Sequence, residues 1–287
     1  MAAPTPTHDR ALDPTGNVMT SASAFHRFAA LAIAILAVAP LASATPSCTA
    51  ESGRQTVALV ELYTSEGCDS CPPADRWLSS AFPGGDTGNA IAMAFHVDYW
   101  DRLGWKDRFA SPDWTKRQYE SARAARSDLV YTPQVLLQGR ELRDWHSEKR
   151  SAAAIAAVAR LPARADIGLE VTPQPGALAV RATARVPDAA SRKGAALFVA
   201  LTEGGLTSEV KAGENAGKRL SHDHVVRVLR GNIAIGAGGE GAAAVVLPLP
   251  AEGGKSRSVV AFVQNADTGE VLQALALPVT PACAPVR

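Results

Sequence analysis

The hydrophobic pattern of the chain changes near residue 163, and this change limits the possible folds more than any other feature. From about residue 55 to 162, stretches typical of buried strands alternate with stretches typical of helices. From about residue 164 to 280, apolar residues alternate with other residues in short runs that Pro, Gly and Asp separate. The pattern therefore predicts an α/β domain over residues 55–162 and an all-β, sandwich-like domain over residues 164–280.

Local signals predict the elements of both parts. Buried strands are expected at 56–64, 91–97 and 135–138, and helices at 74–81, 111–126 and from 147 to just before Pro162. Pro72-Pro73 and Ser111-Pro112 mark the first two helix starts, because proline is tolerated in a first helical turn. In the second part, β-like runs lie at 167–171, 178–186, 195–202, 224–229, 243–249, 258–264 and 271–279.

The charge balance and the motif content exclude several classes of function. Lys and Arg total 29 and Asp and Glu total 28, which gives a formal net charge of +1 in 287 residues. A general nucleic-acid binder normally carries a basic excess, so no nucleic-acid partner is expected. The sequence contains no nucleotide-binding loop, serine-hydrolase elbow or zinc-protease motif, and no cofactor is expected.

The first 44 residues are interpreted as a leader and signal peptide. His26 and Arg27 precede an apolar run at 28–41, which ends in Ala42-Ser43-Ala44. The run is shorter than the ~20 residues that a membrane-spanning helix needs, although an uncleaved anchor is the alternative. Cleavage after Ala44 would leave no membrane span and a periplasmic or secreted protein. The signal pattern begins at Met19. Met19 is therefore an alternative translation start, in which case Met1 is misassigned.

The sharpest chemical signal is Cys68-Asp69-Ser70-Cys71, placed between a predicted strand and a predicted helix. A helix N-terminus carries unpaired N–H groups and a partial positive charge, which lower the pKa of a nearby thiol. A thiolate is the attacking species in disulfide exchange. The spacing lets one cysteine resolve the mixed disulfide of the other, so we expect Cys68 to be the exposed nucleophile and Cys71 the resolving thiol.

Two other readings of the cysteine pair remain open. The pair can form an inert structural disulfide, or half of a zinc site completed by a histidine such as His96 or His222. A weaker metal alternative is the pair His222 and His224, which would share one side of an extended strand.

A second segment strengthens the redox interpretation. Thr132-Pro133-Gln134-Val135 is typical of a loop that ends in a proline and opens a strand. Together with Val60-Glu61-Leu62-Tyr63-Thr64 and the cysteine pair, it resembles the glutaredoxins, whose fold places a cis-proline beside the CxxC motif. The resemblance implies a thioredoxin-like domain over residues 55–162, with Thr132 and Pro133 beside Cys68.

Acidic residues and an insertion distinguish the chain from a glutaredoxin. Glu66, Asp69 and Asp75 oppose the effect of the helix terminus on the thiols, so a strongly acidic Cys68 is not expected. Glu61 is a weak candidate for a buried proton acceptor, and an outward, solvated side chain is the alternative. The aromatic and charged insertion at 96–107 either lines a groove over the cysteines or packs locally.

The motifs V-E-L-Y-T-S-E-G-C-D-S-C-P-P-A-D, F-H-V-D-Y-W-D-R-L-G-W and Y-T-P-Q-V closely resemble a family of secreted bacterial proteins called domain of unknown function 1223. The resemblance covers roughly residues 57–280 and includes the segment 213–227. It implies a thioredoxin-like domain followed by a β-rich domain, and it implies no established substrate.

These observations predict an exported thiol–disulfide oxidoreductase that acts on protein or small-molecule thiols and disulfides. The alternatives are a non-catalytic binding module and a periplasmic metal carrier. Cys48 and Cys283 flank the two predicted domains, and unpaired thiols are uncommon in an exported chain. We therefore expect a structural Cys48–Cys283 disulfide, with free or intermolecular thiols as the alternative. The sequence does not indicate an oligomeric state.

Overall fold

The structure is a computed structural model that describes residues 47–83, 88–280 and 283. The leader and signal peptide expected at residues 1–44 lie outside the described residues. Among the helices of the described part, none has the length and apolar character needed to cross a membrane.

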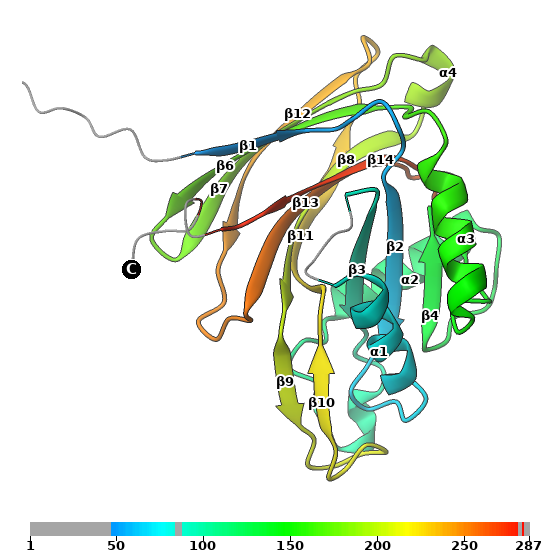
Figure 1. Cartoon of the computed structure of the whole chain (residues 1–287), viewed down its shortest axis with the longest axis vertical. Coiled ribbons are helices and arrows are strands. Elements are labelled where there is room, and N and C mark those ends of the chain that lie inside the picture. Colours follow the sequence, from blue (N-terminus) through cyan, green and yellow to red (C-terminus); the bar gives the residue numbers. More distant parts are fainter. Residues whose placement is uncertain (1–46, 84–87, 281–282, 284–287) are drawn as a thin grey trace, which may run out of the picture. The chain divides into compact units, whose positions relative to one another are not determined.

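An eight-stranded sheet combines strands from both halves of the sequence (Figure 1). Its order is β14-β13-β8-β11-β3-β2-β4-β5. The strands span β2 Ala58–Thr64, β3 Ala90–His96, β4 Gln134–Leu137, β5 Arg140–Glu141, β8 Ala195–Gly204, β11 Val225–Ala234, β13 Ser256–Asn265 and β14 Val271–Pro278.

The two halves of this sheet meet where β11 pairs with β3. A parallel bridge places Val225 opposite Ala94, and the backbone N–H of Ala94 donates to the carbonyl of His224 at 2.8 Å. On the other side of β3, β2 runs parallel over its full length, from Ala58 to Thr64. The central strands of the sheet therefore come from residues that lie far apart in the chain.

A second sheet packs against the C-terminal strands of the first. Its order is β1-β6-β7-β12, with β1 Cys48–Glu51, β6 Asp166–Gln174, β7 Ala177–Arg185 and β12 Glu240–Pro248. The period-2 pattern buries Ile167, Leu169 and Val171 of β6 on one face, where they join Leu197 and Val199 of β8 in a common core. A separate hairpin consists of β9 Leu206–Glu209 and β10 Arg219–His222.

Helices cover both faces of the N-terminal part of the eight-stranded sheet. They are α1 Pro72–Ala81, α2 Pro112–Ala124 and α3 Glu148–Ala159, whereas the 3-10 helix η1 Asp101–Leu103 follows β3 and the short α4 Ala189–Arg192 lies between β7 and β8. Helix α2 begins as its sequence predicts, because the Ser111 side chain accepts from the backbone N–H of Asp113 and Pro112 occupies the first turn. Helices α1 and α3 pack on the opposite face, against Val60 and Leu62 of β2.

A single hydrophobic core under α2 contains residues of both halves. Tyr63 and Phe95 come from the first half, and Val260 and Phe262 come from the second. The rings of Phe198 and Phe262 stack with centroids 5.0 Å apart. Neither half can therefore bury this face without the other.

The prediction of an α/β thioredoxin-like domain followed by an all-β, sandwich-like domain is wrong. Strands of the 55–162 stretch and of the 164–280 stretch form one mixed sheet, and β1 pairs with β6 of the second stretch. Most of the individual strands and helices agree with the sequence pattern to within a few residues. The pattern reports which segments are strands, but it carries no information about which distant strands share hydrogen bonds.

Phe262→Ala tests whether the shared core couples the two halves. Phe262 is fully buried, so the substitution should lower the free energy of unfolding by about 3–5 kcal/mol. All 5 tryptophans lie between residues 77 and 145, in the first half. The urea midpoint measured by tryptophan fluorescence should therefore fall, although the substitution is in the second half.

The matched control is Val246→Ala, on a side chain that is 54% exposed, which should cost less than ~1 kcal/mol. An unchanged tryptophan midpoint in Phe262→Ala, with a separate second transition, would contradict the shared core.

Candidate functional site

The cysteine pair lies where β2 leaves the sheet and α1 begins. The structure joins Cys68 and Cys71 as a disulfide with a Cα–Cα distance of 5.5 Å. Cys71 is the N-cap of α1, and its carbonyl accepts from the backbone N–H groups of Ala74 and Asp75 at 2.9 and 3.1 Å. The hydroxyl oxygen of Ser70 lies 3.3 Å from Sγ of Cys68. The first turn of α1 therefore holds the disulfide at the positive end of the helix dipole.

Both cysteines are covered, which differs from the expectation that Cys68 is exposed. Cys68 and Cys71 are each 0% exposed, whereas the intervening Asp69 and Ser70 are exposed. The sequence pattern does not contain this result, because the covering residues come from other segments of the chain.

The turn between β9 and β10 supplies part of the cover. The side-chain amide of Asn215 donates to the carbonyl oxygens of Glu66 and Cys68 at 2.8 and 2.9 Å. The Glu214 carboxylate accepts from the backbone N–H of Asp69 at 3.1 Å. A turn from the second half of the sequence thus lies directly on the CxxC loop.

The insertion at 96–107 contacts the same loop. A Cβ atom on Gly67 would lie 3.0 Å from Cβ of Trp100, so glycine is needed for this close approach. The indole N–H of Trp105 donates to Oε2 of Glu66 at 2.7 Å.

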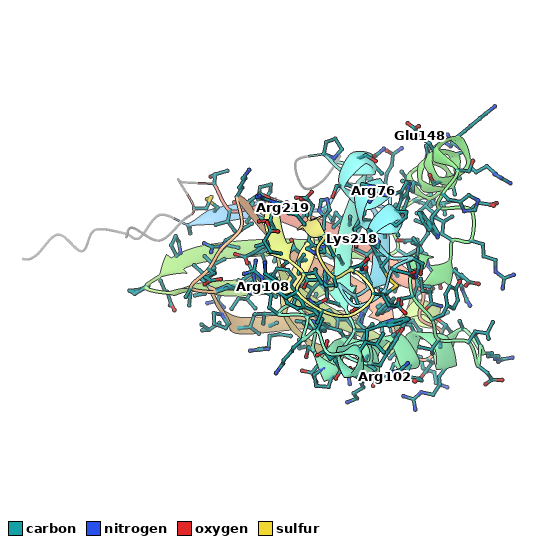
Figure 2. All side chains as sticks on the ribbon, turned by 90° about the horizontal axis from the view of Figure 1, so that it is seen from below. Arg76, Arg102, Arg108, Glu148, Lys218 and Arg219 are labelled. Atoms are coloured by element: carbon teal, nitrogen blue, oxygen red, sulfur yellow. A yellow bond between two sulfur atoms is a disulfide. The ribbon has the colours of Figure 1, made fainter. Side chains whose placement is uncertain are left out.

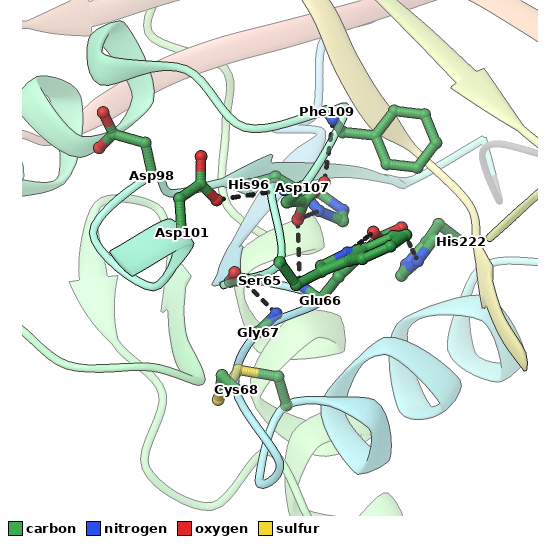
Figure 3. Close-up of polar contacts among 12 residues, drawn as sticks. Ser65, Glu66, Gly67, Cys68, His96, Asp98, Asp101, Asp107, Phe109 and His222 are labelled. Atoms are coloured by element: carbon green, nitrogen blue, oxygen red, sulfur yellow. Dashed lines mark hydrogen bonds and ion pairs between the residues drawn. A yellow bond between two sulfur atoms is a disulfide. The ribbon is translucent and has the colours of Figure 1, made fainter. Parts of the chain in front are cut away.

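Behind the disulfide lies a buried cluster of ionisable side chains (Figure 3). Nδ1 of His96, the last residue of β3, lies 2.6 Å from Oδ2 of Asp107. The same Asp107 oxygen accepts from the backbone N–H of Glu66 at 2.9 Å, and its other oxygen accepts from that of Phe109 at 2.9 Å. Asp107 therefore ties the end of β3 to the CxxC loop.

A second histidine–carboxylate pair completes the cluster. Nε2 of His222 lies 3.2 Å from Oε1 of Glu66, and the His96 and His222 rings have centroids 4.8 Å apart. In the described part of the chain, Nε2 of His96 and Nδ1 of His222 have no hydrogen-bond partner. Two acidic side chains and two imidazoles thus share one buried site immediately before Cys68.

The cluster shifts the pKa values of its members. Burial by itself would lower the pKa of His96, but the charge and hydrogen bond of Asp107 raise it above 6.5. Burial by itself would raise the pKa of Asp107, but His96 and two backbone amides hold it below 3.8. The pKa of Glu66 is also lowered, because its contacts with His222 and Trp105 outweigh burial. His96 and Asp107 therefore each favour the charged form of the other.

Asp75 behaves in the opposite way. It is buried in the first turn of α1, and burial raises its pKa above the usual value despite the nearby charges of His222 and His96. This carboxyl follows Cys71 by one helical turn, so a group with a raised pKa lies next to the disulfide.

Two other predicted site residues lie at different places in the sheet. Glu61 pairs with Arg117 of α2 and accepts from the Tyr63 hydroxyl, so it lies on the face under α2, away from α1. Thr132 and Pro133, joined by a cis peptide bond, precede β4, whose Gln134 pairs with Tyr63. They therefore lie at the end of the sheet where β2 leads to Cys68, and the Thr132 hydroxyl accepts from the Trp100 indole at 2.7 Å.

The histidine pair His222 and His224 does not form one site. His224 has a positive φ of 60°, so the segment is not extended and the assumption of a shared strand face is wrong. His222 faces His96, whereas the His224 ring meets Phe82 edge-on at 6.1 Å. Within residues 47–83, 88–280 and 283, no group of three or more His, Cys, Asp or Glu side chains is arranged to hold a metal ion.

The structure also joins Cys48 to Cys283, with a Cα–Cα distance of 5.7 Å. Cys48 begins β1, so this disulfide ties the edge of the four-stranded sheet to the segment that follows β14.

Sequence reasoning missed how the buried cluster and the cover are assembled. His96 and Glu66 stood out only as a possible zinc ligand and as a negative charge, and Asp107 only as a member of the insertion. Nothing in the sequence indicated a contact between Asn215 and the CxxC loop, because a polar residue in a glycine-containing turn is common. Burial of His96 at a strand end was the available sign, because a buried imidazole requires a partner.

These features define a class of protein in which a β-rich fold with one mixed sheet holds a covered CxxC disulfide beside a buried histidine–carboxylate cluster. The chain belongs to the family described as "Protein of unknown function (DUF1223)", whose model matches residues 59–264. Comparison with curated proteins finds no match.

Two solved structures share the fold. A crystal structure of protein AGR_C_4864 from Agrobacterium tumefaciens is 24% identical with a TM-score of 0.54, over 80% of this chain and 97% of that chain. HBP35 of Porphyromonas gingivalis is 16% identical with a TM-score of 0.59, over 79% of this chain and 76% of that chain. At these identities the likeness concerns the fold alone.

Asp107→Asn tests the buried ion pair through its pH dependence. Removing one partner of a buried pair should lower the free energy of unfolding by about 3 kcal/mol or more. The lowered pKa of Asp107 stabilises the fold above pH 3.8, and this contribution is lost as pH falls through the lowered value. The raised pKa of His96 stabilises it below pH 6.5, and this contribution is lost as pH rises through the raised value.

The difference between wild type and Asp107→Asn should therefore be greatest between about pH 4 and 6.5, as measured by urea unfolding across that range. Asp144→Asn, which removes an exposed pair with Arg150, serves as the control and should cost less than ~1 kcal/mol. A difference that does not vary with pH would show that the pair is not charged.

Proposed function

We propose that this protein is an exported thiol–disulfide oxidoreductase in which Cys68 and Cys71 exchange disulfides with protein or small-molecule dithiols. The observation that carries the proposal is the Cys68–Cys71 disulfide at the N-terminus of α1, backed by buried groups that bind protons. Redox-active cysteine pairs need both a stabilised thiolate and a route for protons.

The proposed reaction is a two-electron exchange. A substrate thiolate attacks Sγ of Cys68, the Cys68–Cys71 bond breaks, and Cys71 leaves as a thiolate. The second substrate thiolate then attacks the substrate sulfur of the mixed disulfide and releases Cys68 as a thiolate. The substrate dithiol is oxidised to a disulfide, and the protein gains two electrons and, once both thiolates are protonated, two protons. The reverse sequence reduces a substrate disulfide.

Neighbouring groups support each half of this exchange. The N-terminus of α1 and the Ser70 hydroxyl stabilise negative charge on sulfur. Asp75, with its raised pKa, is a suitable proton donor to the thiolate of Cys71 one turn away. Nε2 of His96, which has no hydrogen-bond partner among the described residues, provides a second buried atom that can carry a proton.

We also propose a periplasmic or secreted location. The signal-peptide pattern at residues 19–44 supports it. Two disulfides, Cys68–Cys71 and Cys48–Cys283, fit an oxidising compartment, because cytosolic thiols are kept reduced.

One observation favours a second candidate, a non-catalytic module in which Cys68–Cys71 is a structural disulfide. Both cysteines are 0% exposed, and inert disulfides are commonly buried. The two candidates differ in whether native protein exchanges thiols, which the following assay measures.

Cys68→Ser should abolish reduction of insulin disulfides by the protein in the presence of a dithiol reductant, because the variant lacks the sulfur that forms the mixed disulfide and cannot re-form the Cys68–Cys71 bond. The double variant Cys48→Ser/Cys283→Ser is the matched control: it removes the other disulfide and should retain turnover while losing stability. Turnover is measured as insulin precipitation over time. If wild type has no more activity than Cys68→Ser, the oxidoreductase proposal fails and the structural-disulfide candidate is favoured.

A further inference from the structure

We propose that the turn formed by residues 213–218 is a gate over the Cys68–Cys71 disulfide. The Asn215 side chain holds this gate shut, and local opening of the turn exposes the sulfur atoms without unfolding the sheet. This proposal rests on the proposed function in one respect, because that function identifies the molecule admitted by the open gate as a substrate thiolate.

Asn215 keeps this gate closed because its side chain forms hydrogen bonds with two carbonyls of the CxxC loop. Its amide group donates to the carbonyl before Gly67 and to the carbonyl of Cys68 itself, at 2.8 and 2.9 Å. The Lys218 ammonium donates to Oδ1 of Asn215 at 2.8 Å, which fixes the orientation of the amide. Asn215 is fully buried, so loss of its two donors would leave two carbonyls without these bonds.

The rest of the turn has few buried side chains, and its backbone hydrogen bonds lie within the hairpin itself. Between residues 211 and 218, Asn215 is the one buried residue, and Glu214, Ala216, Gly217 and Lys218 are all exposed. Glu214 makes a further contact with the CxxC loop, in which its carboxylate accepts from the N–H of Asp69, and this contact is exposed. A segment with few buried apolar contacts opens at a lower free energy than the sheet around it.

The geometry allows the turn to move alone. Gly213 and Gly217 have φ of 74° and 80° at the two ends of the turn, a backbone region that glycine adopts without strain. Among the described strands, β9 and β10 pair with each other, from Leu206–His222 to Glu209–Arg219, and belong to neither large sheet. Figure 2 shows Lys218 and Arg219 of this hairpin on the face seen from below, near Arg76 of α1, and α1 contacts β10.

The position of the turn therefore controls whether a thiolate can attack the Cys68–Cys71 disulfide. With the turn in place, Cys68 and Cys71 are 0% exposed and no thiolate can approach in line with the disulfide. Release of Asn215 frees the Cys68 carbonyl and uncovers the residue that receives the attack. The gate would admit thiols only when the turn is displaced, by thermal opening or by a substrate that competes for the two carbonyls.

The test measures how fast a water-soluble phosphine reduces Cys68–Cys71 in the native, full-length protein. The phosphine takes an oxygen atom from water, supplies two electrons to the disulfide, and leaves two thiols and a phosphine oxide. Rapid alkylation and peptide mass mapping then give the rate for each disulfide, with Cys48–Cys283 as an internal reference.

Asn215→Ala should raise the rate of Cys68–Cys71 reduction ~10-fold or more, because two hydrogen bonds are lost. Asn215→Asp should do the same, since it keeps the side-chain volume but has no donor for the carbonyls. Lys211→Ala, at an exposed position in the same hairpin connection, is the matched control and should leave the rate unchanged. Circular dichroism checks that each variant is folded.

Wild-type reduction should not depend on urea at concentrations below the unfolding transition, because local opening exposes little surface. The gate is overturned if reduction requires global unfolding, or if Asn215→Asp leaves the rate at the wild-type value. Its failure differs from failure of the proposed function. Fast, Asn215-dependent reduction without insulin turnover supports the gate and rejects the oxidoreductase, whereas turnover with an Asn215-independent rate does the reverse.

Discussion

The pairing of β11 with β3 is the contact on which the rest of the site depends. The bridge between Val225 and Ala94 places β10, which immediately precedes β11, beside α1. That placement brings His222 to Glu66 and Asn215 to the carbonyl of Cys68. The shared core around Phe262 then stabilises the arrangement from the other face of the sheet. The CxxC motif comes from one half of the sequence, but its cover and one of its histidines come from the other.

Burial of four ionisable side chains next to a disulfide is costly unless each is paired. The fold offsets the cost with the His96–Asp107 and His222–Glu66 pairs and with backbone donors to Asp107. Asp75 is buried as well, and burial raises its pKa despite the nearby charges of His222 and His96. Such an arrangement is costly for stability alone, and the proposed thiol–disulfide exchange would give it a use in proton transfer.

Local features of this fold were predictable from sequence, and long-range features were not. The strand before Cys68, the helix start at Pro72 and the N-cap at Ser111 follow from short-range rules, and the structure agrees with them. The two-domain prediction failed because a period-2 pattern identifies strands without naming their partners. The assumed His222–His224 pair failed because His224 adopts a positive φ, which is uncommon for a non-glycine residue and breaks the extended strand that the pairing requires. Asn215 could be found only once the turn was placed on the CxxC loop.

The proposed function requires that Cys68–Cys71 is a redox couple that works within the folded protein. It is tested most directly by equilibrating native protein with graded ratios of reduced and oxidised glutathione, and by reading each cysteine after acid quench and alkylation. Cys68 and Cys71 should titrate together along one reversible two-electron curve while Cys48–Cys283 stays oxidised. A Cys68–Cys71 bond that resists every ratio until the protein unfolds, and is then reduced together with Cys48–Cys283, would contradict it.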